Sequence, residues 1–109
     1  PTTMIYLQQS EEQQTIKAER HYTPRGICEI SLINTLTRET FSAELNTYTT
    51  SRLYIIAKAT LPIMPIGEYG YTITDEDGRE CSVGLAVVGG YYAPTIETEE
   101  TIEYRQYGE

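Results

Sequence analysis

The sequence is short of the residues from which most metal and catalytic sites are built. It has no tryptophan, one phenylalanine, one histidine and two cysteines among 109 residues. Two thiols alone, from Cys28 and Cys81, cannot make a structural zinc site, and the only histidine, His21, lies in a polar, charged segment. Both cysteines fall on apolar faces of expected strands, and no secretory segment precedes them. We therefore expect buried free thiols rather than a disulfide.

Long apolar runs are also missing. No stretch reaches the roughly 20 residues that a transmembrane helix needs, and the N-terminal residues lack the basic and then apolar segments of a signal peptide. The length suits one domain with its own core. We expect a single domain made without a signal peptide.

Catalytic motifs are absent as well. No Gly-x-Ser-x-Gly motif occurs, and no helix is expected after the glycines of residues 84–90, which excludes the usual phosphate-binding loop. Residues 75–78 (DEDG) supply only part of a calcium loop and are favoured turn formers. The glutamates of residues 97–103 form a run rather than the two sides of a cleft. The sequence thus predicts a protein that is not an enzyme and binds no cofactor or metal.

The charge is distributed unevenly along the chain. The formal net charge is −8; acidic and basic residues cancel over residues 1–66, whereas residues 67–109 hold ten acidic residues against Arg79 and Arg105. Such a surface repels a phosphate backbone, so we expect no nucleic-acid partner. It complements a basic protein surface.

Tyrosine is the abundant aromatic residue, with ten copies. It combines apolar area with a hydroxyl group, so it suits both strands and protein interfaces. The tyrosines near the C-terminus could complete the domain's own core or contact a partner, and both interpretations stay open. The candidate interface residues are the tyrosines and acids of this segment: Tyr91, Tyr92, Glu97, Glu99, Glu100, Tyr104 and Tyr107.

Residues 61–90 define the fold class best. Tyr69, Tyr71 and Ile73 alternate with polar or small residues, which is typical of a half-buried strand. Residues 75–78 provide a tight turn. The alternation then restarts on a return strand with Cys81, Val83, Leu85 and Val87.

The same criterion predicts strands over residues 3–8, 27–34, 39–45 and 52–60. Residues 10–20 could form a helix or, over residues 15–22, an edge strand. Residues 46–51 are expected to be a loop, residues 61–67 a proline-containing connection, and residues 101–107 could form a last strand. The expected inward-facing residues are Cys28, Ile30, Leu32, Phe41, Ala43, Leu45, Leu53, Ile55, Ala57 and Ala59.

About seven short strands with frequent turns predict an all-β protein, an antiparallel sandwich with extended termini. A small barrel is the main alternative. We expect three parts within the single domain: an N-terminal segment (residues 1–26), a sandwich core (residues 27–90) and an acidic, tyrosine-bearing C-terminal arm (residues 91–109).

The order of three segments resembles a known family. They are ISLINTLTRETFSAEL, SRLYIIAKATLP and IGEYGYTITDEDGRECSVGLAVVG, and the similarity covers residues 27–90. They are similar to small immunoglobulin-like virion proteins of tailed bacteriophages, in particular the crAss-like phages of gut bacteria. The matching positions belong to a Gly-x-Tyr-x-Tyr strand, an Asp-Gly turn and a Gly-Leu-x-x-Val return strand: Gly67, Tyr69, Tyr71, Asp77, Gly78, Gly84, Leu85 and Val88.

The resemblance implies an immunoglobulin-like sandwich with a structural role in a virion assembled in the host cytoplasm. It favours a capsid auxiliary or decoration protein, bound to the shell in many copies. A neck or tail component is an alternative, as is a module that binds host-surface glycans or proteins. The implied partners are other virion proteins, with a basic surface on a major capsid or neck protein, and not nucleic acid or a membrane.

Overall fold

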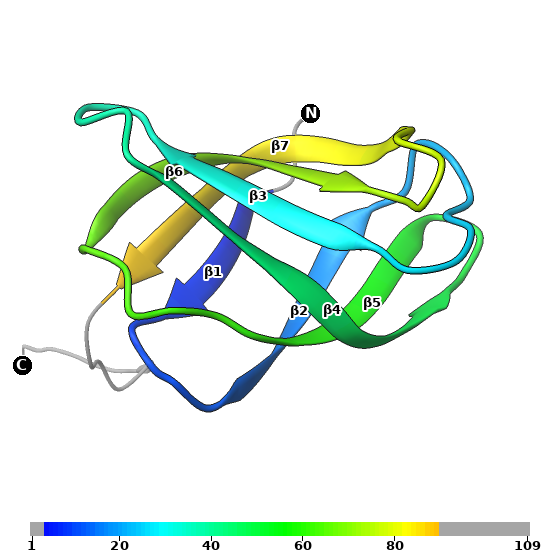
Figure 1. Ribbon diagram of the computed structural model, residues 1–109, viewed down its shortest axis with the longest axis horizontal. Helices are drawn as coiled ribbons and strands as arrows, with labels where there is room; N and C mark the ends of the chain where they lie inside the picture. Colours follow the sequence, from blue (N-terminus) through cyan, green and yellow to red (C-terminus); the bar gives the residue numbers. More distant parts are fainter. Residues whose placement is uncertain (1–3, 90–109) are drawn as a thin grey trace, which may run out of the picture.

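A computed structural model describes residues 4–89 and shows an all-β fold (Figure 1). Within this part of the chain, no helix has the length and apolarity needed to cross a membrane. The seven strands are β1 (Met4–Gln8), β2 (Gln13–Glu19), β3 (Glu29–Asn34), β4 (Thr40–Thr50), β5 (Tyr54–Thr60), β6 (Gly67–Thr74) and β7 (Glu80–Gly89).

The strands form one mostly antiparallel sheet in the order β1-β7-β6-β3-β4-β5-β2, and only β1 and β7 pair in parallel. Strand β4 joins the two halves of the sheet, because its first part pairs with β3 and its second part with β5. A register shift between Leu45 and Thr47 marks the change of partner.

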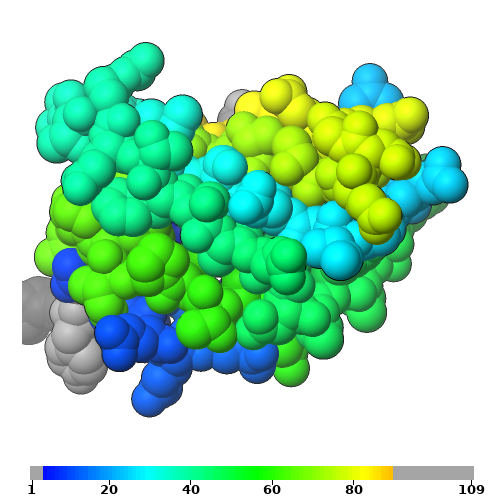
Figure 2. All heavy atoms as spheres, in the orientation of Figure 1, coloured from blue at the N-terminus to red at the C-terminus, as the bar shows by residue number. Residues whose placement is uncertain are grey.

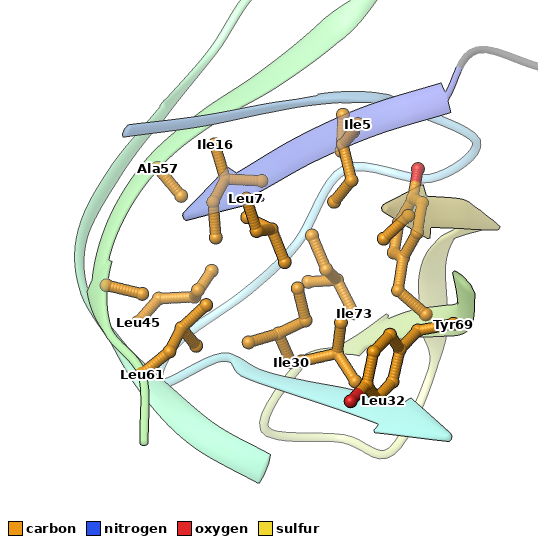
Figure 3. Packing of buried hydrophobic residues seen from close by; sticks show 14 of the residues in the cluster. Ile5, Leu7, Ile16, Ile30, Leu32, Leu45, Ala57, Leu61, Tyr69 and Ile73 are labelled. Atoms are coloured by element: carbon orange, nitrogen blue, oxygen red, sulfur yellow. The ribbon is translucent and has the colours of Figure 1, made fainter. Parts of the chain in front are cut away.

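The two end strands of the sheet approach each other at one point. The Gln14 side-chain amide on β2 donates to the Gln8 carbonyl on β1 at 2.8 Å and accepts from the Gln8 N–H at 2.9 Å. The sheet therefore curls over on itself and encloses one core, as the converging side chains in Figure 3 show.

Two tyrosines are the largest fully buried side chains of this core. The Tyr69 hydroxyl donates to the Pro65 carbonyl at 2.6 Å, and the Tyr71 hydroxyl lies 3.0 Å from the Ser82 hydroxyl. Because each hydroxyl group has a partner, the rings are buried without an unpaired polar atom. The apolar core residues come from every strand: Ile5, Leu7, Ile16, Ala18, Cys28, Ile30, Leu32, Leu45, Ile55, Ala57, Ala59, Leu61, Met64, Tyr69, Tyr71, Ile73, Cys81, Ala86 and Val88.

The strands expected near residues 3–8, 27–34, 39–45 and 52–60 are confirmed as β1, β3, the first part of β4, and β5. For residues 10–20 the edge-strand interpretation is correct, although β2 spans Gln13–Glu19 instead of residues 15–22. Ile16 and Ala18 are buried, whereas Lys17 between them and Thr15 before them are exposed. The helix interpretation failed because Ile16 and Ala18 follow the period of two of a strand.

Two expectations about the β4–β5 region are wrong. Residues 46–51 do not form a loop, because β4 continues to Thr50 and pairs with β5. Its β-branched threonines suit such a strand. Leu53 does not face inward; it precedes β5 in the turn and is 60% exposed.

The return strand β7 differs most from its expected pattern. The register passes from Ile73 opposite Ser82 to Thr74 opposite Glu80, so Cys81 is an additional residue at a β-bulge. Both Cys81 and Ser82 are buried there. Because one additional residue reverses the faces of the following residues, Ala86 and Val88 enter the core. The expected alternation that puts Cys81, Val83, Leu85 and Val87 on one face is therefore wrong, since Cys81 is buried while Val83 and Leu85 are exposed.

The two cysteines are free and buried, as expected. Cys28 precedes β3 and Cys81 lies in β7, and β6 pairs between these two strands. Two strand spacings amount to about 9–10 Å, which exceeds the Cα separation that a disulfide spans.

Candidate functional site: the outer face of β1, β7, β6 and β3

The acidic turn between β6 and β7 is organised by one carboxylate. Asp75 Oδ1 accepts the backbone N–H groups of Asp77 and Arg79, each at 3.0 Å, and Oδ2 accepts that of Arg25 at 3.2 Å. Partial burial opposes the ionised form, but these N–H donors and the charge of Arg79 outweigh it and lower the pKa of Asp75. Gly78 supplies the positive φ, 82°, that completes the turn.

The same turn holds the loop that precedes β3. Glu76 Oε1 accepts the Ile27 N–H at 3.2 Å, and the Glu76 N–H donates to the Arg25 carbonyl at 3.1 Å. Across residues 4–89, no group of three or more His, Cys, Asp or Glu side chains could hold a metal ion. The DEDG turn is thus a structural clamp between two loops.

The two cysteine thiols, of Cys28 and Cys81, are free and buried. Burial raises the pKa of the Cys28 thiol, and burial together with the nearby Asp75 carboxylate raises that of Cys81 to about 11. Both groups therefore stay protonated near neutral pH, which is unfavourable for a nucleophile.

The bulge in β7 creates an exposed apolar surface on the outside of the sheet. Outward-facing residues lie in register across four strands, with Met4 opposite Leu85, Leu85 opposite Gly70, and Gly70 opposite Ile33. Several side chains remain well exposed: Tyr6 66%, Val83 44%, Ile33 43% and Leu85 37%. We call this set the apolar face: Met4, Tyr6, Ile33, Val83, Leu85 and Val87.

Gly70 forms a depression in the apolar face. A side chain at this position would meet no atom within 4 Å. The depression has a volume of about 250 Å³ and is lined by Ile33, Thr35, Arg38, Gly70, Tyr71, Thr72, Val83 and Gly84. Ile33 and Val83 line a space of side-chain size that Thr35, Arg38 and Thr72 also border, so a projecting apolar group of another molecule fits against the two apolar side chains.

A row of carboxylates borders the apolar face. Glu44 lies opposite Glu29 in the β3–β4 ladder, Glu29 lies opposite Thr74, and Thr74 lies opposite Glu80. The three glutamates are exposed and define the acidic row. The ion pairs among residues 4–89 are Glu19–His21 and Arg25–Asp77, so none neutralises this row.

The acidic row has a cost in the isolated domain, because like charges directly opposite on a sheet repel each other. We predict that Glu44→Gln increases the free energy of unfolding by about 0.2–1 kcal/mol at low salt. Urea unfolding at low and high salt measures this gain, which should shrink as salt screens the charges. Glu11→Gln, at an exposed turn position outside the row, is the control and should change little; a destabilised Glu44→Gln variant would contradict the prediction.

In the space-filling view, atoms of β3 (cyan) lie between those of the β6–β7 hairpin (yellow-green to yellow) and those of β4 (green) (Figure 2). The apolar face and the acidic row are therefore built from segments that are far apart in the sequence.

The interface candidates predicted from the sequence lie outside the described residues. They are Tyr91, Tyr92, Glu97, Glu99, Glu100, Tyr104 and Tyr107.

Comparison with models of protein families, with curated proteins and with solved structures finds no match for this chain.

Proposed function

We propose that this chain is a non-enzymatic structural protein of a bacteriophage virion that binds a neighbouring protein through the apolar face and the acidic row. The observation that carries the proposal is the unneutralised row of Glu29, Glu44 and Glu80 beside exposed apolar side chains. Repulsion within the row destabilises the free domain. Basic groups of a partner would offset this repulsion, while the apolar face supplies buried area.

The finer architecture that we propose is an immunoglobulin-like sandwich. One half would contain β1, β7, β6 and β3, and the other β2 and β5, with β4 connecting them. The support comes from the β3-β6-β7 and β2-β5 pairings, which correspond to the C-F-G and B-E pairings of immunoglobulin domains. The parallel β1–β7 pair places the first strand beside the last described strand.

Within the virion, a capsid auxiliary or decoration protein is the role that we favour, and a neck or tail component is the alternative. The support is the sequence resemblance over residues 27–90 and a seven-stranded domain with exposed apolar side chains on its outer face. Such a domain in many copies needs a partner surface that is repeated, as a shell of major capsid proteins is. The partner would carry basic side chains around an apolar projection that enters the depression at Gly70.

The experiment is quantitative mass spectrometry of purified particles of a phage whose genome encodes this chain. We expect the protein in many copies per particle, and cross-linking from the acidic row to lysines of a capsid protein. The E29K/E44K double variant should be lost from particles, while the E11K/E12K variant, with the same change in net charge, should be retained. Purified particles that lack the wild-type protein would overturn the proposal, and cross-links to neck or tail proteins would replace the capsid role with the alternative.

A further inference from the structure

The outer side of the half of the sheet made by β2, β5 and the second part of β4 carries the opposite charge to the acidic row. Two cross-strand rows run over β2, β5 and the second part of β4. One row consists of Thr15, Lys58 and Thr47, and the next of Lys17, Ile56 and Thr49. These residues are exposed and point away from the core. We call this set the basic face: Thr15, Lys17, Thr47, Thr49, Ile56 and Lys58.

Its lysines are not neutralised by carboxylates of residues 4–89. The Lys17 ammonium lies 4.3 Å from the centroid of the Tyr54 ring, and neither Lys17 nor Lys58 takes part in an ion pair of the described residues. Glu19 at the end of this face lies 3.8 Å from His21. The face therefore offers two ammonium groups and the apolar Ile56, which is 40% exposed.

We propose that the basic face of one copy of this chain binds the acidic row and the apolar face of a second copy. The inference rests on the protein-binding role proposed above for the acidic row and names its partner. Lys17 and Lys58 are diagonal neighbours on adjacent strands, a position in which Cα atoms lie about 7–8 Å apart. The acidic row places carboxylates on three strands across about 14 Å, so two lysines can each reach a glutamate while Ile56 contacts apolar side chains beside the row.

The inner sides of both halves of the sheet share one core, so the apolar face and the basic face point away from each other. Strand β4 carries Glu44 of the acidic row as well as Thr47 and Thr49 of the basic face. Copies would therefore associate head to tail, which generates rings or open chains of domains rather than closed pairs. Pairing of two acidic rows is unfavourable because it brings six carboxylates together. Charge complementarity thus selects the basic face as the partner.

Sedimentation velocity on the purified full-length chain tests the proposal. At about 1 mM protein, where even an interaction of about −4 kcal/mol is detectable, we expect concentration-dependent species larger than a monomer. The E29K/E44K variant and the K17E/K58E variant should each lower the association constant at least about tenfold, because each places like charges on both contacting faces. The E11K/E12K variant keeps both faces and should associate like the wild type.

An equimolar mixture of E29K/E44K and K17E/K58E is the decisive sample. In this mixture the lysines placed in the row of E29K/E44K meet the glutamates placed on the basic face of K17E/K58E. The unchanged acidic row of K17E/K58E meets the unchanged basic face of E29K/E44K. Association should therefore return, with the two variants alternating. A wild type that is monomeric at this concentration, or a mixture that stays monomeric while the wild type associates, would overturn head-to-tail binding. The virion role is tested separately, since loss of E29K/E44K from particles would still support it if the wild type is monomeric.

Discussion

Replacement of Ile30 by alanine should lower the free energy of unfolding by about 2–5 kcal/mol. Ile30 is fully buried at the centre of the sheet, with Ala43 opposite it on β4 and Ile73 opposite it on β6. The loss combines the transfer of apolar carbon to water with the cavity that remains among packed neighbours. Urea unfolding monitored by tyrosine fluorescence and circular dichroism measures it.

The chain offers a matched control on the same strand. Ile33 is three residues further along β3, but it faces outward and is 43% exposed. Ile33→Ala should cost less than about 1 kcal/mol because less apolar area leaves water on folding. The Ile33→Ala substitution should instead weaken the binding of a partner to the apolar face. Equal losses of stability in the two variants would contradict the assignment of opposite faces to these residues.

The sequence pattern was sufficient for β3, β5 and β6. In each of these strands every second residue is buried, and the two tyrosines of β6 are among the buried residues. It failed in β7, where residues 85–88 (LAVV) are all apolar and carry no alternation that fixes a face. The bulge at Cys81 decides the orientation there, and it depends on the register with β6.

The acidic row could not be predicted for a related reason. Glu29, Glu44 and Glu80 are single acidic residues in separate strands, and each resembles an ordinary solvent-facing position. They come together only through the pairing of β4 with β3, of β3 with β6 and of β6 with β7. The acidic bias toward the C-terminus was visible in the composition, but the row draws two of its three members from the part of the chain in which charges cancel.

Substitution of Asp75 by asparagine should destabilise the domain strongly at neutral pH. The two carboxylate oxygens accept three backbone N–H groups, from Arg25, Asp77 and Arg79. Asparagine has one acceptor oxygen, so its amide nitrogen would face at least one of these donors and leave it unpaired. The loss should exceed that of Asp77→Asn, since Asp77 is exposed and its side chain makes only a 3.9 Å ion pair with Arg25.

The pH dependence of the free energy of unfolding distinguishes the ionic role of Asp75 from an effect of side-chain shape alone. The pKa of Asp75 is lower in the folded state than in the unfolded chain. Its stabilisation is therefore complete well above the usual carboxyl pKa of about 4. It is lost as the pH falls below that value and through the lowered folded-state pKa. Unfolding measured between about pH 7 and pH 3 should show wild type and Asp75→Asn converging in acid; a difference that stays constant would contradict the ionic role.

The consequence of Asp75→Asn extends to binding because the clamp sets the start of β7. The Asp75 N–H donates to the Arg79 carbonyl at 3.0 Å, next to Glu80 and the bulge at Cys81. A loosened turn would free the register that places Glu80 in the acidic row and turns Val83 outward. We therefore expect Asp75→Asn to weaken head-to-tail association at neutral pH even though Asp75 lies outside both contacting faces. Wild-type association in a folded Asp75→Asn variant would show that the register of β7 is held by the sheet alone.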